Sequence, residues 1–335
     1  MLNDEPKEQQ NDTSLDAVLR PNSWGNYIGQ ETIKKNLSIL IRASREREEP
    51  VEHLLFYGPS GLGKTTLAYL VAKEMGVSMK ITSGPAIERA GDLASILTNL
   101  MPGEILFIDE IHRLNKMIEE ILYPAMENRQ LDIIIGKGPG ARSIQIDLPP
   151  FSLIAATTRI SLLSSPLRAR FSGGIFKLDY YIPEEIKKII LNSAKILKIP
   201  VDEDAALFLA ERSRFTPRVA NRLLKRARDY AQIHRYEKIN LEVVQKTLEL
   251  LQIDEHGLEE HDRKILESIV LKFNGGPVGV QTLAAAASEE IGTIEDVYEP
   301  YLLRLGFLEK TPRGRKATEK AFGLFGKKLP QQKLV

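Results

Sequence analysis

The stretch HLLFYGPSGLGKTTLAYLVAKEMG, His53–Gly76, decides the fold of the first half of the chain. Its beginning, Leu54–Tyr57, is a short apolar run of the kind that forms a buried parallel strand. The phosphate-loop pattern G-x-x-x-x-G-K-[ST] then runs from Gly58 to Thr65, and apolar residues recur at helical spacing after it. A strand, a glycine-rich turn and a helix in this order predict a nucleotide-binding α/β domain.

The residue types of this loop fit the binding of phosphate. Glycines allow backbone N–H groups to turn inward around phosphate oxygens, and the following helix directs its positive N-terminus at them. Lys64 can reach the β- and γ-phosphates, and the hydroxyl of Thr65 can bind Mg²⁺. We therefore expect ATP and Mg²⁺ as ligands.

A second strand is expected at Ile105–Ile108, within EILFIDEIHRLN. It ends at Asp109 and Glu110, and ligands of an open parallel sheet lie at the carboxyl ends of its strands. Asp109 is then placed to hold Mg²⁺ through water, and Glu110 to polarise an attacking water. The alternative is a surface Asp-Glu pair at a strand end. For His112 we expect a local hydrogen-bonding or packing role.

A third strand, SLIAATTR, ends in Thr157 and Thr158, which would lie near the γ-phosphate if this strand neighbours the other two. Alternation alone does not decide which threonine points inward. Arginines follow: Arg168 and Arg170 in SSPLRARFSGG, and Arg218 just inside a helix that opens after Pro217. Because phosphoryl transfer gains from an added positive charge, these suggest one arginine acting in cis and one in trans.

Composition sets broad limits on the chain. With 335 residues, 43% apolar and 27% charged, it can form two or three domains with buried cores. The absence of Cys excludes disulfides and thiolate metal sites. No apolar run approaches the roughly 18 residues of a membrane span, and no signal-peptide pattern opens the chain. We expect a cytoplasmic protein that does not act at a membrane.

The net charge of +1 says nothing about nucleic acid, but the ends differ: residues 1–14 are acidic and residues 308–335 are basic. Near the C-terminus, three short helices are expected at Asp262–Phe273, Val280–Ser288 and Ile294–Leu305. FLEKTPRGRKATEK, Phe307–Lys320, then reads as strand, turn and strand, which together predicts a winged helix. Its expected DNA contacts, to phosphates rather than to bases, are Lys310, Arg313 and Arg315. A solvated basic tail is the alternative.

A second hairpin is expected in LDIIIGKGPGARSIQIDL, Leu131–Leu148, where two alternating apolar runs flank a glycine-rich turn. An ordinary sheet hairpin is the simplest interpretation.

In this order the motifs resemble those of AAA+ ATPases, and most closely the RuvB family of bacterial Holliday junction branch-migration motors. The resemblance covers roughly Leu19 to Phe322, with these main segments: LRPNSWGNYIGQE, GPSGLGKTTLA, LFIDEIHRLNKMIEEILYPAMEN, AATTRISLLSSPLRARF, TPRVANRLLKRARDYA and DVYEPYLLRLGFLEKTPRGRKATEKA. It implies an α/β fold: a P-loop AAA+ ATPase domain (1–182), a helical lid domain (183–254) and a C-terminal winged-helix domain (255–335).

The resemblance also implies site residues. Those expected around the nucleotide are Leu19 and Arg20 on the adenine side, Gly61, Gly63, Lys64, Thr65 and Thr66 at the phosphates and Mg²⁺, and Glu127, Asn128 and Arg129. Asp109 and Glu110 become the metal-site and catalytic acids, and Arg170 a finger inserted into the neighbouring subunit's site. Tyr181 and Arg218 become nucleotide sensors of the lid, beside Thr157 and Thr158.

As partners the resemblance implies four-way DNA junctions and their duplex arms, a homohexameric ring, a RuvA-type junction-binding protein on hairpin 130–148 and, indirectly, a RuvC-type resolvase. The chain departs from the family at Ser60, where Pro is usual, at Phe215, where Gly is usual, at Glu127–Arg129 and by an extra residue within 172–174. Two alternatives remain: another AAA+ protein, such as a clamp-loader subunit or initiator, and a DNA-binding regulator that uses nucleotide only as a switch.

Overall fold

The computed structural model describes residues 18–135 and 142–328. They form two compact units, each taken by itself below. The first holds the chain up to Gly58, Gly63–Asp179 and Lys188–Pro200. The second holds Pro59–Leu62, Tyr180–Lys187 and the chain from Val201 on. The glycine-rich turn predicted within Leu131–Leu148, the acidic residues 1–14 and the last residues of the basic segment, 329–335, lie outside the described residues.

The first unit is built on a parallel five-stranded sheet with the order β2-β3-β6-β1-β7. Its strands are β1 (Leu54–Tyr57), β2 (Met79–Ser83), β3 (Ile105–Asp109), β6 (Ser152–Thr157) and β7 (Gly174–Lys177). The three predicted strands, β1, β3 and β6, are therefore neighbours at the centre. All six residues of β6 are buried, as expected for a central strand covered on both faces.

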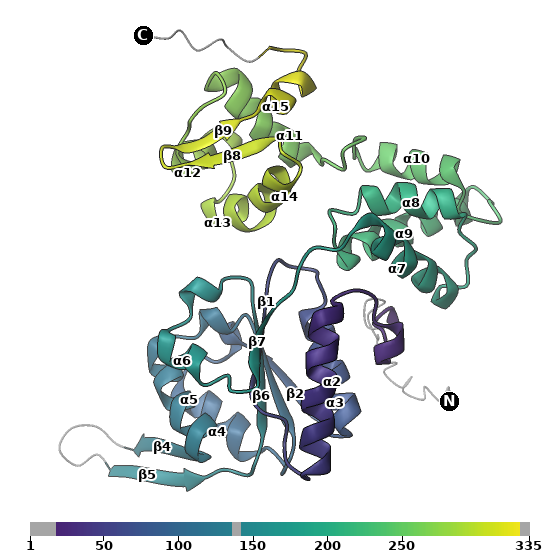
Figure 1. The fold of residues 1–335 in the computed structure, drawn as a ribbon. Coiled ribbons are helices and arrows are strands. Elements are labelled where there is room, and N and C mark those ends of the chain that lie inside the picture. Colours follow the sequence, from purple (N-terminus) through teal and green to yellow (C-terminus); the bar gives the residue numbers. More distant parts are fainter. Residues whose placement is uncertain (1–17, 136–141, 329–335) are drawn as a thin grey trace, which may run out of the picture. The chain divides into compact units, whose positions relative to one another are not determined.

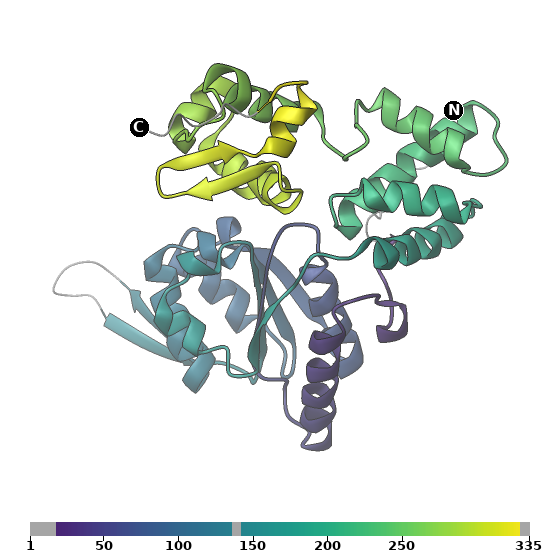
Figure 2. The same cartoon turned by 45° about the horizontal axis from the view of Figure 1, so that its top comes forward.

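Helices cover both faces of this sheet. α2 (Glu31–Glu46) and α3 (Lys64–Met75) lie on one face, and α4 (Ala90–Thr98), α5 (Lys116–Asn128) and α6 (Ser165–Ala169) on the other (Figure 1). The turned view shows the same two-sided arrangement (Figure 2). One apolar core joins the sheet to the second group of helices, through residues such as Leu106, Leu122 and Leu167. Because all strands run the same way, their carboxyl ends share one edge.

A separate antiparallel hairpin, β4 (Gln130–Ile135) and β5 (Arg142–Asp147), projects from the first unit beyond α5 (Figure 1). Its two predicted strands are confirmed, and they pair with Leu131 opposite Ile146 and Ile133 opposite Ile144. Leu131 is buried in the core of the unit, so the hairpin is anchored at its base.

The lid helices are α7 (Pro183–Ile196), α8 (Glu203–Glu211), α9 (Pro217–Ile233) and α10 (Leu241–Leu250). α7 belongs to the second unit up to Lys187 and to the first from Lys188 on, and the other three lie in the second unit. α9 begins at Pro217, one residue before the predicted start, and the hydroxyl of its N-cap Thr216 accepts a hydrogen bond from the N–H of Val219. α10 ends at Leu250, within the predicted limits of the lid domain.

The C-terminal part has its own apolar core and the helices and hairpin of a winged helix. Its elements are α11 (Glu260–Glu267) continued by η6 (Ser268–Lys272), α12 (Val280–Ala287), α13 (Ile291–Thr293), η7 (Ile294–Tyr298), α14 (Glu299–Arg304), β8 (Leu308–Thr311), β9 (Gly314–Ala317) and α15 (Glu319–Leu324). The three predicted helices are present within a few residues of their expected limits. The short helix α15 was not predicted.

Candidate nucleotide site and DNA-binding surface

The backbone of the phosphate loop depends on glycine. Gly58, Gly61 and Gly63 have φ of +141°, +81° and +96°, a region that favours residues without a Cβ. A Cβ at Gly58 would lie 2.6 Å from the carbonyl oxygen of Leu178. Gly63 is also the N-cap of α3 and has no side chain, so it leaves the first-turn N–H groups of this helix for an anion.

Lys64 lies inside this loop. Its side chain is only 8% exposed, and its ammonium group donates a hydrogen bond of 2.7 Å to the carbonyl oxygen of Gly58. A buried cation held by a backbone carbonyl at a helix N-terminus suits phosphate oxygens, which would bring the opposite charge. The donor set of this loop therefore fits the predicted nucleotide.

Asp109 ends β3, and Glu110 begins the 3₁₀ turn η3 (Ile111–Arg113). Glu110 has a left-handed backbone with φ of +49°, and its N–H donates to Oδ1 of Asp109 at 2.9 Å. Its half-exposed carboxylate lies 3.3 Å from the guanidinium of Arg113. The carbonyl of Glu110 packs so closely on Gly84 that a Cβ there would lie 2.4 Å away. The backbone of the predicted catalytic acid is thus firmly held.

The two threonines at the end of β6 have different surroundings. Thr157 is 1% exposed, and its hydroxyl shares a hydrogen bond of 2.9 Å with Nδ1 of His112 and accepts one of 3.0 Å from the N–H of Arg159. Thr158 is exposed at the same sheet edge. The sequence left open which of the two threonines points inward. In the structure the hydroxyl of Thr157 forms hydrogen bonds within the protein, and Thr158 is exposed to solvent.

Arg170 follows α6 and is held by the protein on several sides. Its guanidinium donates to the carbonyl oxygen of Pro166 at 2.8 Å and to the carboxylate of Glu127 at 3.1 Å, and it lies over the ring of Tyr123, 4.3 Å from the centroid. Burial raises the pKa of the Tyr123 phenol. Asn128 and Arg129 are exposed next to Glu127. The predicted finger and the predicted 127–129 contacts thus lie on one surface of the first unit.

The predicted adenine-side segment lies along α3. Leu19 is buried, and the guanidinium of Arg20 lies 5.9 Å from the ring centroid of Tyr69 on that helix. The ammonium group of Lys73, also on α3, donates to the carbonyl oxygen of Asn22. The segment is therefore fixed against the helix that starts at the phosphate loop.

The predicted lid sensors contact the middle of the phosphate loop within the second unit. Arg218 donates to the hydroxyl of Ser60 at 3.1 Å, and its N–H donates to the carbonyl oxygen of Gly61 at 3.4 Å. The hydroxyl of Tyr181 donates to the carbonyl oxygen of Leu62 at 3.4 Å. Ser60, a departure from the family pattern, thereby gains a partner that Pro could not provide.

Phe215, the other lid departure, has φ of +57°, which explains why Gly is usual there. A non-glycine residue in this region costs about 1 kcal/mol. Contacts offset this cost: the guanidinium of Arg304 lies 4.6 Å from the Phe215 centroid, and the rings of Tyr180 and Tyr301 lie 6.3 and 6.0 Å away. Burial raises the pKa of Tyr301.

The basic hairpin β8–β9 presents its three predicted DNA contacts unequally. Arg313 is exposed in the turn, and Lys310 is exposed with its ammonium group 3.7 Å from Glu299. Arg315 is only 7% exposed and forms ion pairs with Glu299 and, at 3.1 Å, with Glu295. These hydrogen bonds raise the pKa of its guanidinium. The burial of this side chain, with Nε donating to Glu299 and Nη2 to Glu295, disfavours the predicted phosphate contact of Arg315.

Comparison with known proteins covers almost all of the chain. Family models match three consecutive regions: the Holliday junction DNA helicase RuvB P-loop domain at residues 19–177, the RuvB AAA lid domain at 181–254 and the RuvB C-terminal winged helix domain at 255–326. The structure of Thermotoga maritima RuvB, described as a Holliday junction branch migration motor, is similar with a TM-score of 0.85 and 48% identity over 93% of this chain and 100% of that one. The chain belongs to the RuvB family.

Two variants of the same Thermotoga protein, K64R and T158V, are similar at 48% identity over 93% of this chain, with TM-scores of 0.86 and 0.85. They cover 99% and 100% of those chains. Membership of the RuvB family confirms the predicted fold of P-loop AAA+ domain, lid and winged helix, and the prediction of an ATPase of the Holliday junction helicase type. It favours neither a clamp-loader subunit nor a nucleotide-switched regulator.

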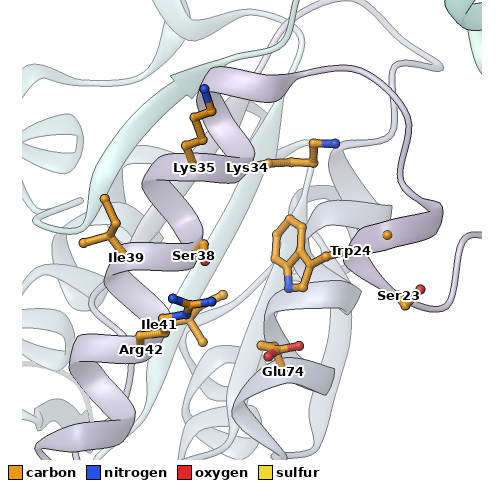
Figure 3. A pocket seen from close by; sticks show the side chains of 10 residues that line it. Ser23, Trp24, Lys34, Lys35, Ser38, Ile39, Ile41, Arg42 and Glu74 are labelled. Carbon is orange, nitrogen blue, oxygen red and sulfur yellow. The ribbon is translucent and has the colours of Figure 1, made fainter.

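A cavity of about 850 Å³ lies between the turn η1 (Trp24–Asn26) and α2, with Glu74 of α3 at its edge (Figure 3). Its lining includes Trp24, Lys34, Lys35, Ile39, Arg42 and Glu74, and no residue of the phosphate loop. Lys34 is already bonded to Glu31 and to the carbonyl oxygen of Tyr27. This hollow is therefore not the phosphate site.

None of the helices in the described ranges combines the length and apolar character that a membrane span needs. Likewise, within the described part of the chain no three His, Cys, Asp or Glu side chains gather into a group that could hold a metal ion.

Proposed function

We propose that this chain is an ATP-driven DNA translocase that promotes branch migration of Holliday junctions in recombination and repair, as a homohexameric ring. The observation that carries this proposal is the similarity at 48% identity to a branch migration motor over 93% of the chain, from the phosphate loop to the winged helix. The predicted domain limits (1–182, 183–254, 255–335) and the cytoplasmic location are part of the same proposal.

In the proposed reaction Lys64 neutralises the β- and γ-phosphates of ATP, and the loop N–H groups, with Thr65 and Thr66, surround them. The hydroxyl of Thr65 and, through water, Asp109 would hold Mg²⁺, which supplies positive charge to the transferring phosphoryl group. Glu110 orients and polarises the attacking water, and exposed Thr158 lies at the strand end that faces the γ-phosphate in this scheme.

Arg170 is proposed to act on a neighbouring subunit's nucleotide, together with the surface formed by Glu127, Asn128 and Arg129. Its guanidinium is held by Pro166, Glu127 and Tyr123, so little side-chain freedom would be lost when it meets a phosphate. An arginine added in trans contributes on the order of 10³–10⁵ to the rate of such reactions. A closed ring gives every subunit such a neighbour.

DNA duplex arms are proposed to contact the winged helix through Lys310 and Arg313, while a RuvA-type protein binds the hairpin 130–148 and a RuvC-type resolvase acts indirectly. Within the lid, Tyr181 and Arg218 would report the nucleotide state, because both contact the phosphate loop. Rearrangement of the lid would then move the DNA-binding domain.

The test is ATP-dependent dissociation of a synthetic four-way junction, with the RuvA-type partner present and then omitted. We expect partner-stimulated dissociation that Lys64→Ala abolishes together with ATP binding, and that Glu110→Gln abolishes while ATP binding remains. Lys35→Ala, an exposed lysine of the same domain, is the matched control and should behave as wild type. Vigorous ATP hydrolysis without junction processing under any partner condition would refute the motor assignment.

A further inference from the structure

Thr157 lies where three segments of the nucleotide site meet. Its carbonyl oxygen accepts a hydrogen bond of 3.2 Å from the N–H of Gly58, the first residue of the phosphate loop. Its hydroxyl accepts from the N–H of Arg159 and pairs with Nδ1 of His112 at 2.9 Å. One buried residue therefore bonds to the phosphate loop, to the segment after Thr158 and to the turn after Glu110.

The His112 side of this contact belongs to a short element. η3 contains only Ile111–Arg113. Its N-cap, Glu110, has a left-handed backbone, and the N–H of Arg113 donates a hydrogen bond of 2.8 Å to the carbonyl oxygen of Glu110. A single turn of 3₁₀ helix does not hold its own position well, because few backbone hydrogen bonds stabilise it. Its position therefore depends on its neighbours. The carbonyl of Glu110 packs on Gly84 and Ile111 is buried in the core, and the hydrogen bond between His112 and Thr157 ties the turn to the end of β6.

The contact also separates the two threonines. Since successive residues of a strand point to opposite sides, a hydroxyl of Thr157 that is turned inward and bonded leaves Thr158 facing the sheet edge. If the side chain of Thr157 could rotate freely, its buried hydroxyl would lose the hydrogen bond to His112, and no water would replace that partner. The positions of the two threonines would then be less well defined. Misplacement of a reacting group by about 1 Å can cost on the order of 100-fold in rate.

We propose that His112 is a positioning residue for ATP hydrolysis. Its hydrogen bond to Thr157 fixes the turn that follows Glu110 against the end of β6 and so holds Glu110 and Thr158 in a fixed position relative to each other. This inference rests on the proposed roles of Glu110 and Thr158. His112 itself does not touch the nucleotide or the attacking water in this scheme.

The imidazole offers a matched pair of variants. Asn places a polar atom the same number of bonds from Cβ as Nδ1 of His, whereas Leu keeps a similar branched shape without polarity. Thr157 offers a second pair, because Ser keeps the hydroxyl and Val replaces it with a methyl group. A packing role alone would make Asn at least as harmful as Leu.

The experiment measures kcat and KM for ATP hydrolysis on junction DNA, and binding of a fluorescent ATP analogue, with full-length wild type and the four single variants. We expect His112→Leu and Thr157→Val to lower kcat by about 10- to 100-fold, while KM and analogue affinity change less than about threefold. His112→Asn and Thr157→Ser should stay within about threefold of wild type. The double variant His112→Leu/Thr157→Val should be no slower than the slower single variant, because both remove one shared bond.

An equal loss in His112→Asn and His112→Leu, or additive losses in the double variant, would overturn the inference. Glu110→Gln is measured in parallel. If it is inactive while His112→Leu hydrolyses ATP normally, only this inference fails; if Glu110→Gln itself hydrolyses ATP at the wild-type rate, the proposed role of Glu110 fails and the inference with it. Thermal unfolding of each variant identifies any loss that comes from misfolding.

Discussion

The hairpins β4–β5 and β8–β9 read alike in the sequence, with alternating residues on both sides of a glycine-containing turn, yet the structure uses them differently. In β8–β9 the inward position is taken by a charged residue, Arg315, which is 7% exposed. In β4–β5 an apolar residue, Ile144, is 45% exposed. Simple hydrophobic alternation predicts the opposite burial for both residues.

The neighbours of each hairpin explain the difference. Arg315 exchanges two backbone hydrogen bonds, of 2.9 and 2.8 Å, with Val278, so the wing is tied to the core of its own domain and its inner face is covered. Glu299 on α14 then supplies the charge that the buried guanidinium requires. The β4–β5 hairpin is buried at Leu131 and Leu148 but leaves Ile144 in contact with solvent. Alternation thus defines two faces, and the surroundings decide what covers each.

The largest effect is expected for Arg315→Ala. The change would leave the carboxylate of Glu299, which is 3% exposed, without its main partner. We expect it to lower the free energy of unfolding by about 3 kcal/mol, the low end for a broken buried ion pair. The low end applies because Lys310 lies 3.7 Å from Glu299 and remains as a second partner. Urea unfolding of the full-length chain, followed by a signal from the winged-helix domain, measures this loss of stability. The double change Arg315→Met/Glu299→Gln should recover much of the loss. An undiminished stability combined with a loss of DNA affinity would restore the phosphate-contact interpretation of Arg315.

A smaller effect is expected for Arg313→Ala, because this side chain is exposed in the turn and its loss removes one proposed phosphate contact. Affinity for duplex DNA should fall about tenfold at 0.1 M salt, equally for all sequences, and the salt slope should decrease by about one unit. Stability should change by less than about 0.5 kcal/mol. Fluorescence anisotropy over a salt series tests this, with the exposed lid residue Lys246→Ala as control. Losses that depend on base sequence would contradict a contact to phosphate.

The smallest effect is expected for Ile144→Ser. The free protein should be as stable as wild type, because this side chain is already half exposed to solvent. Affinity for a RuvA-type partner should fall about fivefold, because the variant loses about 1 kcal/mol of apolar burial in the complex. Gln145→Ala, on the other face and bonded to Asp132, is the matched control. Titration calorimetry with the partner measures both. Equal affinities for the two variants would remove the hairpin from the proposed interface.

Much of the nucleotide site could be predicted because it depends on local backbone geometry. The glycines of the phosphate loop are required by their own φ values, and the polar residues at the ends of β3 and β6 follow from the strands that precede them. The hydrogen bond between Thr157 and His112 could not be predicted in this way, because the sequence indicated only a local role for His112. Their hydrogen bond joins residues 45 positions apart, and nothing in either local pattern indicates it.

By itself, the sequence determined the phosphate loop, the three central strands and the acids at a strand end, because each of these depends on short-range periodicity or on residues with unusual backbone freedom. The three-part organisation was implied by the resemblance to the RuvB family. Only the tertiary structure decided that the hydroxyl of Thr157 is bonded inside, that Phe215 is compensated by Arg304, and that Arg315 is buried while Arg313 is exposed. The physical reason is the same in each case: the free energy of a polar or strained group is set by partners that are distant in the chain and near only after folding.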